Sequence, residues 1–352
     1  MVAGEIAAGR PLLHCVAIGE NRGMSTAVPS LLEALTTIPK VSAAGWRRLG
    51  WLRRYLITVR AAVLPLTLYA SVLGGLLALP WTPGEGWRFL LVTLGLVFAH
   101  ATSNLLNDEV DWLTGLDRDA YFRVRYGAHP LAQGLMNPAT HGLLLLATVG
   151  AALALGLAIF RLTGPPAYWL ATAGALILLF YTWPMKRLGL GEIAVFVVWG
   201  PLMVGGSYWV VSGDWGPDIA ALSLLAGLGP TVVVMAKHAD KRRDDAARGV
   251  RTLPVILGPV WGPRTVALLA AAQVGGAVVW AWIGAAWGFL LMLLAAPALV
   301  RLMAICVRAR PPARPKSFPA AIWPLWYSAS AFRFARIAGA ALAGAALIEG
   351  LR

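Results

Sequence analysis

Long apolar runs constrain this 352-residue chain more than any other feature of its sequence. Runs of about 18 or more apolar residues recur along it, and each is long enough to cross a hydrocarbon core of about 30 Å. Charged residues make up only 13% of the chain, whereas about a quarter of a typical soluble domain is charged. The sequence therefore predicts a polytopic membrane protein built from helices, which satisfy their own backbone hydrogen bonds in lipid.

Nine transmembrane helices are predicted, which makes the expected fold all-α. Proline–glycine pairs or charged clusters separate most of the spans. An acidic cluster follows the second span and another follows the sixth, so we expect two four-helix halves and a ninth helix. The predicted spans are residues 57–80, 88–107, 139–161, 165–183, 191–212, 217–237, 263–284, 286–305 and 329–350.

Basic residues concentrate before the first predicted span and after spans two, four, six and eight. The positive-inside rule places these segments in the cytoplasm and the C-terminus outside. We therefore expect a multi-pass protein of the inner (plasma) membrane, with both acidic clusters facing the cytoplasm. The same distribution explains the net charge of +14 as a topology signal, and it argues against nucleic acid as a partner.

The chain divides into an N-terminal cytoplasmic extension, residues 1–50, and a transmembrane domain, residues 51–352. The extension lacks the apolar core of a secretory signal, and Met24 is a second candidate for the first residue. The sequence leaves open whether this extension is ordered. Two cysteines, Cys15 and Cys306, lie far apart and are too few for a disulfide framework or a thiolate metal site.

Half of the 16 acidic residues lie in two short segments, five after the second predicted span and three after the sixth. In the first segment Asn104, Asn107, Asp108 and Asp111 share one face if the helix continues. Carboxylates at this spacing repel one another unless a cation lies between them. Acidic groups at a membrane boundary are also functional candidates by default. The pattern favours metal binding over solvated surface charge.

The second acidic segment carries Asp240 and Asp244 at a spacing of four, so we expect them to share a helix face as well. Two helix ends that each offer two carboxylates fit Mg²⁺, which binds oxygen ligands and shares them with substrate phosphates. Solvated surface charge is an equally good interpretation of Glu109, Asp119 and Asp245. The predicted catalytic residues and metal ligands are Asp108, Asp111, Asp240 and Asp244.

Cations in the same loops predict a site for a diphosphate. Lysine follows phosphate oxygens as a point charge, and arginine holds two oxygens in a fork. Lys186 is well placed, because it follows Tyr181-Thr-Trp-Pro, where the proline ends the fourth span. Topology signals are the alternative interpretation of each single cation. The expected substrate contacts are Asn104, Asn107, Asp117, Arg123, Tyr181, Lys186, Lys241 and Arg251.

Both acidic segments resemble the Asp-rich motifs of one enzyme family. Asn107-Asp-Glu-Val-Asp111 resembles the first motif of the UbiA superfamily of intramembrane prenyltransferases, and Asp240-Lys-Arg-Arg-Asp244 resembles the second. The chain covers the nine-helix length of that family. Within it, the chain is most similar to the branch that prenylates 1,4-dihydroxy-2-naphthoate. The similar stretches are Asn107–Asp117, Tyr181–Glu192, Gly200–Gly206 and Arg251–Gly258.

Two stretches depart from the family pattern near the expected site. Lys237-His-Ala239 stands where the family usually carries Asn and Arg, and His129–Gly134 replaces an Arg-Pro-Leu-Pro-Ser-Gly segment. These departures leave the metal chemistry intact and make the acceptor the open question.

The resemblance implies a UbiA-like fold and Mg²⁺-dependent transfer of a polyprenyl group from its diphosphate to an aromatic acceptor. The expected acceptor is 1,4-dihydroxy-2-naphthoate, which would lose its carboxylate as CO₂ and give demethylmenaquinone. The alternatives are 4-hydroxybenzoate, homogentisate, haem or a chlorophyll precursor. A transporter is less favoured because the acids lie at helix ends rather than at the bilayer midplane. A non-catalytic subunit is less favoured because both motifs are present. The lipid bilayer is the other expected partner, and no protein partner is assigned.

Overall fold

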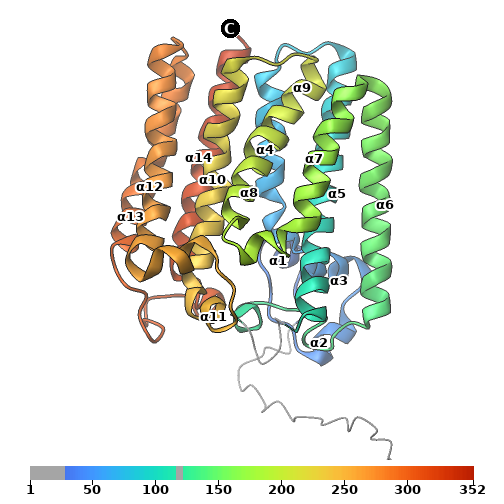
Figure 1. The fold of residues 1–352 in the computed structure, drawn as a ribbon, viewed down its shortest axis with the longest axis vertical. Coiled ribbons are helices and arrows are strands. Elements are labelled where there is room, and N and C mark those ends of the chain that lie inside the picture. The colour runs from blue at the N-terminus through green and yellow to red at the C-terminus, as the bar shows by residue number, and fades with distance from the viewer. Residues whose placement is uncertain (1–27, 116–121) are drawn as a thin grey trace, which may run out of the picture.

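The structure, a computed structural model, describes residues 28–115 and 122–352, and its regular elements there are helices. The long helices run side by side, and the short helices α1, α2, α3 and α11 gather at the end opposite the C-terminus (Figure 1). The all-α membrane fold predicted from the apolar runs is confirmed.

Seven helices in the described part are long and apolar enough to cross a membrane. The predicted count of nine is not confirmed. The fourth predicted span is the shorter helix α7 (Pro165–Tyr181), and the first is a pair of helices bent by 55°. The seven are α5 (Pro83–Leu113), α6 (Pro138–Thr163), the run Gly191–Ser212, α10 (Pro217–Asp240), α12 (Leu253–Ile283), the run Trp287–Cys306, and α14 (Trp326–Gly350).

Two of these runs combine helices of different pitch. Gly191–Ser212 consists of α8 (Gly191–Val197), a π-helical segment η4 (Val198–Gly205) and α9 (Gly206–Ser212). Trp287–Cys306 consists of the 3₁₀ segment η5 (Trp287–Ala295) and α13 (Ala296–Cys306). The short connecting helices are η2 (Phe122–Arg125), η3 (Met185–Arg187), α11 (Arg242–Ala247) and η6 (Ala320–Ile322).

The bend in the first predicted span lies at Arg60. Helix α3 (Trp51–Thr58) ends just before it, and η1 (Ala61–Val63) with α4 (Pro65–Leu77) begins just after it. Arg60 has a left-handed backbone with φ of 57°, a conformation that costs a non-glycine residue about 1–2 kcal/mol. The bend places the Arg60 side chain against α5, where it makes an ion pair.

Helix α5 extends to Leu113, six residues beyond the predicted end of the second span. It starts with Pro83 in its first turn and a capping box between Thr82 and Glu85, a common start signal. The extension keeps the first acidic segment helical as far as Leu113. As the spacing predicts, Asn104, Asp108 and Asp111 are all buried.

Small residues hold the core together around α10, α12, α14 and α4. Their side chains let helices approach closely, which is how membrane helices pack when no hydrophobic effect drives them together. Gly200 on η4 and Gly227 on α10 face each other: a Cβ at Gly200 would lie 2.5 Å from the backbone oxygen of Ser223 on α10, and a Cβ at Gly227 would lie 2.7 Å from that of Phe196 on α8. This contact fixes the π-helical segment against α10.

The described part of the N-terminal extension, residues 28–50, contains two short helices. These are α1 (Leu31–Thr36) and α2 (Ala43–Arg48). Trp46 and Leu49 pack into a small core with Ile57 of α3 and Ala128 of the loop after η2. The extension therefore covers the end of the helix bundle at which the acidic segments lie.

Candidate functional site

A cavity of about 1660 Å³ lies among α4, α5, α6, α7, α10 and α14. Leucine, valine and alanine make up nearly half of the residues that line it, which suits an apolar chain. Some polar wall residues come from α1 and α14, and the polar end of the cavity is formed by residues from the ends of α5, α7 and α10 and from the Arg60 bend. They include Arg60, Ser103, Asn104, Asn107, Tyr181 and Lys237.

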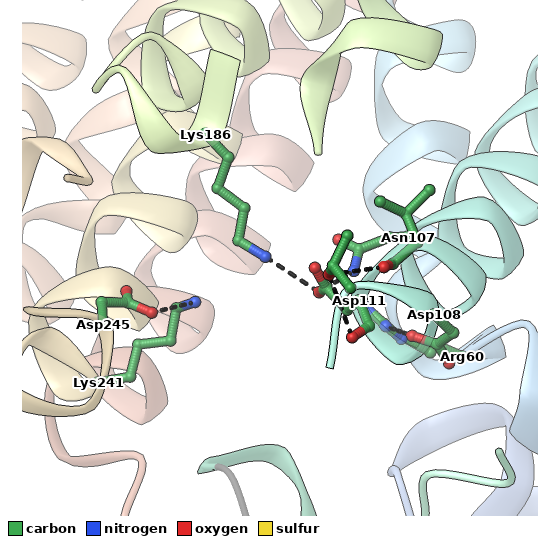
Figure 2. A network of polar contacts seen from close by, with 9 residues as sticks. Arg60, Asn107, Asp108, Asp111, Lys186, Lys241 and Asp245 are labelled. Atoms are coloured by element: carbon green, nitrogen blue, oxygen red, sulfur yellow. Dashed lines mark hydrogen bonds and ion pairs between the residues drawn. The ribbon is translucent and has the colours of Figure 1, made fainter. Parts of the chain in front are cut away.

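The carboxylates of α5 lie beside this polar end, and each pairs with a cation (Figure 2). Asp108 is fully buried and accepts a hydrogen bond from the Arg60 guanidinium. Asp111 accepts one from Asn107 Nδ2 at 2.6 Å and one from Lys186 Nζ at 3.1 Å. Both arginine and lysine partners make charge-assisted bonds of the stronger kind.

Asn104 and Lys186 are positioned by separate backbone features. Asn104 Nδ2 donates to the carbonyl oxygen of Val59 at 2.9 Å, so it fixes the backbone next to the Arg60 bend. Lys186 is buried in η3, in the loop that follows α7, and reaches α5 across 75 positions of sequence. Two of the predicted substrate contacts therefore shape the site in addition to facing it.

The second acidic segment does not bring its predicted pair to the first. Both carboxylate oxygens of Asp240 accept bonds from the start of α14: from Tyr327 N at 3.0 Å, from Ser328 N at 2.9 Å and from Ser328 Oγ at 2.5 Å. Asp240 thus caps α14, where a carboxylate is favoured by the free N–H groups and the helix dipole. Asp244 pairs with Arg125 at 2.8 Å, a residue whose side chain is half exposed.

The two carboxylates lie apart from the first acidic segment because the helix that was expected to carry both of them is broken. Helix α10 ends at Asp240 and α11 begins at Arg242, so Lys241 lies between two helices. The spacing argument required Asp240 and Asp244 to share one continuous helix. Because they do not, the four predicted metal ligands do not converge in this structure.

Asp245 and Lys241 occupy the interior position instead. Both are buried, and Lys241 Nζ lies 3.0 Å from Asp245 Oδ1. Burial alone would lower the pKa of Lys241, but the Asp245 carboxylate outweighs it and the pKa is raised above its usual value. Asp245 is therefore not the solvated surface charge that the sequence allowed. The Lys–Asp spacing of four was the signal in the sequence for this pair.

Two histidine–glutamate pairs, one fully buried and one partly buried, were not expected from the sequence. His238 on α10 bonds Glu192 on α8, and Glu192 also accepts from Leu253 N at 3.4 Å. His141 on α6 bonds Glu109 on α5 at 2.5 Å. These pairs tie the ends of neighbouring helices together, so Glu109 is a structural residue rather than a solvated charge.

The remaining predicted contacts are placed in different ways. Tyr181 lines the cavity. Arg251 is exposed before α12 and makes no side-chain bond to any residue in the described ranges. Arg123 lies in η2, and its side chain is outside what the structure describes. Asp117 and Asp119 fall in 116–121, outside the described residues.

The residues present fit one divalent cation on α5. Mg²⁺ commonly takes one or two carboxylates and completes its shell with water and substrate phosphate. Asp108 and Asp111 share one face of α5, and Asn107 lies next to them, with its amide nitrogen bonded to Asp111. Within residues 28–115 and 122–352, no cluster of three or more His, Cys, Asp or Glu side chains could hold a metal ion.

The fold and this site define a helical membrane protein with a large apolar cavity that ends in paired carboxylates and cations. Residues 63–329 match the UbiA prenyltransferase family. The chain belongs to that family, which confirms the resemblance seen in the two acidic segments.

Similar proteins share about 28% of aligned residues with this chain. The 2-carboxy-1,4-naphthoquinone phytyltransferase of Synechocystis is 28% identical over 59% of this chain and 65% of its own length. The digeranylgeranylglyceryl phosphate synthase of Thermococcus gammatolerans is 29% identical over 53% of this chain and 63% of its own length. The 1,4-dihydroxy-2-naphthoate octaprenyltransferase of Haemophilus influenzae is 28% identical over 58% of this chain and 69% of its own length. The chain thus spans a little under two thirds of the first two relatives.

Solved structures of the family share the fold. A UbiA homologue from Aeropyrum pernix superposes with a TM-score of 0.60 at 19% identity, covering 82% of this chain and 98% of the homologue. A digeranylgeranylglyceryl phosphate synthase superposes with a TM-score of 0.55 at 17% identity, covering 84% and 99%. The UbiA-like fold expected from the sequence is confirmed.

Proposed function

We propose that this protein transfers a prenyl group from a prenyl diphosphate to an aromatic acceptor, with 1,4-dihydroxy-2-naphthoate as the favoured acceptor. The observation that carries the proposal is the apolar cavity of about 1660 Å³, whose polar end includes Arg60 and Asn107, the residues that bond the carboxylates of Asp108 and Asp111. An apolar tail fits the cavity, and a diphosphate fits the cations. The site would face the cytoplasm of the inner membrane, as the distribution of basic residues indicates.

Binding of the diphosphate is assigned to the cations that now neutralise the buried carboxylates. Lys186 and Lys241 are point charges able to follow phosphate oxygens, and Arg60 offers a fork for two of them. A divalent cation such as Mg²⁺, held by Asp108 and Asp111, would supply further positive charge that makes the diphosphate a better leaving group. A UbiA homologue from Archaeoglobus fulgidus has been solved with GPP and Mg²⁺ bound.

The reaction breaks the allylic C–O bond of the donor and one bond of the acceptor ring, and it forms one C–C bond. The allylic C–O bond of the donor breaks, and its electron pair leaves with the diphosphate, whose new charge Lys186 and Lys241 stabilise. An electron-rich ring carbon then bonds to C1 of the prenyl cation. The ring regains aromaticity when the attacked carbon loses its other substituent: a carboxylate departs as CO₂ and leaves its electron pair in the ring, or, in an acceptor attacked at a C–H carbon, a proton is lost to solvent. The leucine-rich cavity wall excludes water that would otherwise capture the cation.

The acceptor is assigned from two relatives whose names contain a naphthoate or a naphthoquinone. A third relative is named for a glyceryl phosphate product, so the family alone does not select the acceptor. The other acceptors weighed are 4-hydroxybenzoate, homogentisate, haem and a chlorophyll precursor.

An acceptor screen at one fixed donor tests this assignment. The purified chain in lipid nanodiscs would be given labelled geranylgeranyl diphosphate, Mg²⁺ and each acceptor in turn. We expect prenylated product with 1,4-dihydroxy-2-naphthoate and a rate at least about tenfold lower with the others, since one unmatched polar group costs about 1–3 kcal/mol. Transfer to 4-hydroxybenzoate without transfer to the naphthoate would reject the acceptor and keep the reaction class.

A further inference from the structure

The turn between α10 and α11 presents an ammonium group to the interior where carboxylates were expected. Lys241 lies in this turn, and it is only 4% exposed. Its partner Asp245 is 0% exposed, and the two are joined at 3.0 Å. Burying a charged pair so completely costs free energy unless the geometry of the pair is good. This pair is therefore part of the packed interior rather than a surface contact.

The other two carboxylates of residues 240–245, those of Asp240 and Asp244, bond groups away from Lys241. Asp240 uses both carboxylate oxygens on the first turn of α14. Asp244 pairs with the half-exposed Arg125. The α10–α11 turn therefore offers the interior one carboxylate, which already has a cation of its own.

Three of the buried carboxylates, Asp108, Asp111 and Asp245, each pair with a cation, and the three cations come from separate elements. Asp108 pairs with Arg60 from the α3–η1 bend, and Asp111 pairs with Lys186 from η3. The third pair is Lys241 with Asp245. In Figure 2 this third pair lies across from Asp111, and Lys186 extends from above toward the space between them. On α5 a divalent ion can bind two carboxylates that share one helix face, whereas at Asp245 it would find a single carboxylate with the Lys241 ammonium already 3.0 Å from Oδ1.

We propose that Lys241 takes the place of a second divalent cation, so that the protein binds one divalent ion per chain, at Asp108 and Asp111, together with a diphosphate. Lys241 supplies fixed positive charge to the diphosphate from the α10–α11 side. This inference rests on the proposed function for the identity of the diphosphate as a substrate group, and it assigns the α10–α11 turn a role different from that of α5.

The first test counts metal ions. The full chain in detergent would be titrated with Mn²⁺ in the presence of inorganic diphosphate, and free Mn²⁺ would be measured by electron paramagnetic resonance. We expect one Mn²⁺ bound per chain, and the Lys241→Asp variant, which gains a carboxylate and loses the ammonium, should bind two. Two ions per unaltered chain, or none, would overturn the proposal.

The second test measures the affinity for inorganic diphosphate with Mn²⁺ present. Loss of one charge-assisted contact in Lys241→Ala should weaken binding roughly tenfold or more, while the exposed control Lys316→Ala should change nothing. Lys241→Arg keeps the cation and should restore binding to within about threefold, which separates charge from folding. Equal affinity in Lys241→Ala and the unaltered chain would refute the role.

The metal count and the proposed function can fail separately. One Mn²⁺ per chain without prenyl transfer to any acceptor would reject the function and keep the inference. Prenyl transfer with two Mn²⁺ per chain would keep the function and reject the inference.

Discussion

Replacing Asp111 by Asn should lower kcat/KM for prenyl transfer by about 100-fold or more, the range seen when a preorganised charge is removed from an active site. The substitution preserves the shape of the side chain and the bond from Asn107. It removes the charge that positions Lys186 at 3.1 Å and that we assign to the divalent ion. Steady-state rates at saturating acceptor, with labelled prenyl diphosphate, check this.

Asp244→Asn is the matched control for Asp111→Asn. Both residues lie in the acidic segments, but Asp244 bonds Arg125 near the surface. Pairs of that kind contribute about 0–1 kcal/mol, so we expect kcat/KM to stay within about threefold of the unaltered chain. Equal and severe losses of kcat/KM in both variants would support a site in which all four predicted carboxylates bind metal. Full activity in Asp111→Asn would show that this carboxylate on α5 takes no part in the reaction.

Replacing Asp240 by Ala should destabilise the protein by about 2–4 kcal/mol, because two backbone N–H groups and a hydroxyl at the start of α14 lose a charged acceptor. The expected fall in Tm is roughly 5 °C or more. Asp240→Asn keeps one acceptor oxygen and should lose about half as much. Thermal unfolding in detergent, followed by tryptophan fluorescence, measures both.

Activity per folded molecule separates this helix-capping role from a catalytic one. Below its Tm, Asp240→Asn should retain prenyl transfer within about tenfold of the unaltered chain, since its lost charge acts on α14 rather than on the diphosphate. A loss as large as that of Asp111→Asn, with an unchanged Tm, would show that Asp240 acts in catalysis.

Helix positions were predictable because length and hydropathy dominate in a membrane. Each predicted span overlaps a helix or helix pair of the structure. The α5 stripe was predictable for a related reason, since Asn104, Asp108 and Asp111 lie within one unbroken helix and a helical period relates their side chains. Where a helix is unbroken, the spacing of residues in the sequence is enough to predict which side chains share a face.

The second acidic segment could not be predicted in the same way, because α10 ends within it. A break at Lys241 changes which carboxylate faces inward, and periodicity gives no signal of the break. The ion pairs of Arg60 and Lys186 could not be predicted from the sequence either. They join α5 to residues 48 and 75 positions away, through a bend and a loop whose course depends on the packed fold.

The most direct test of the central claim is a balanced count of the two products of one reaction. The purified chain in nanodiscs would receive labelled geranylgeranyl diphosphate, 1,4-dihydroxy-2-naphthoate and Mg²⁺, and both prenylated naphthalenediol and free diphosphate would be measured. The account predicts equal molar amounts of the two from the unaltered chain, and initial rates of both that are lower by about 100-fold or more in the Asp111→Asn variant. A folded, unaltered chain that yields no prenylated product with any of the acceptors would contradict it.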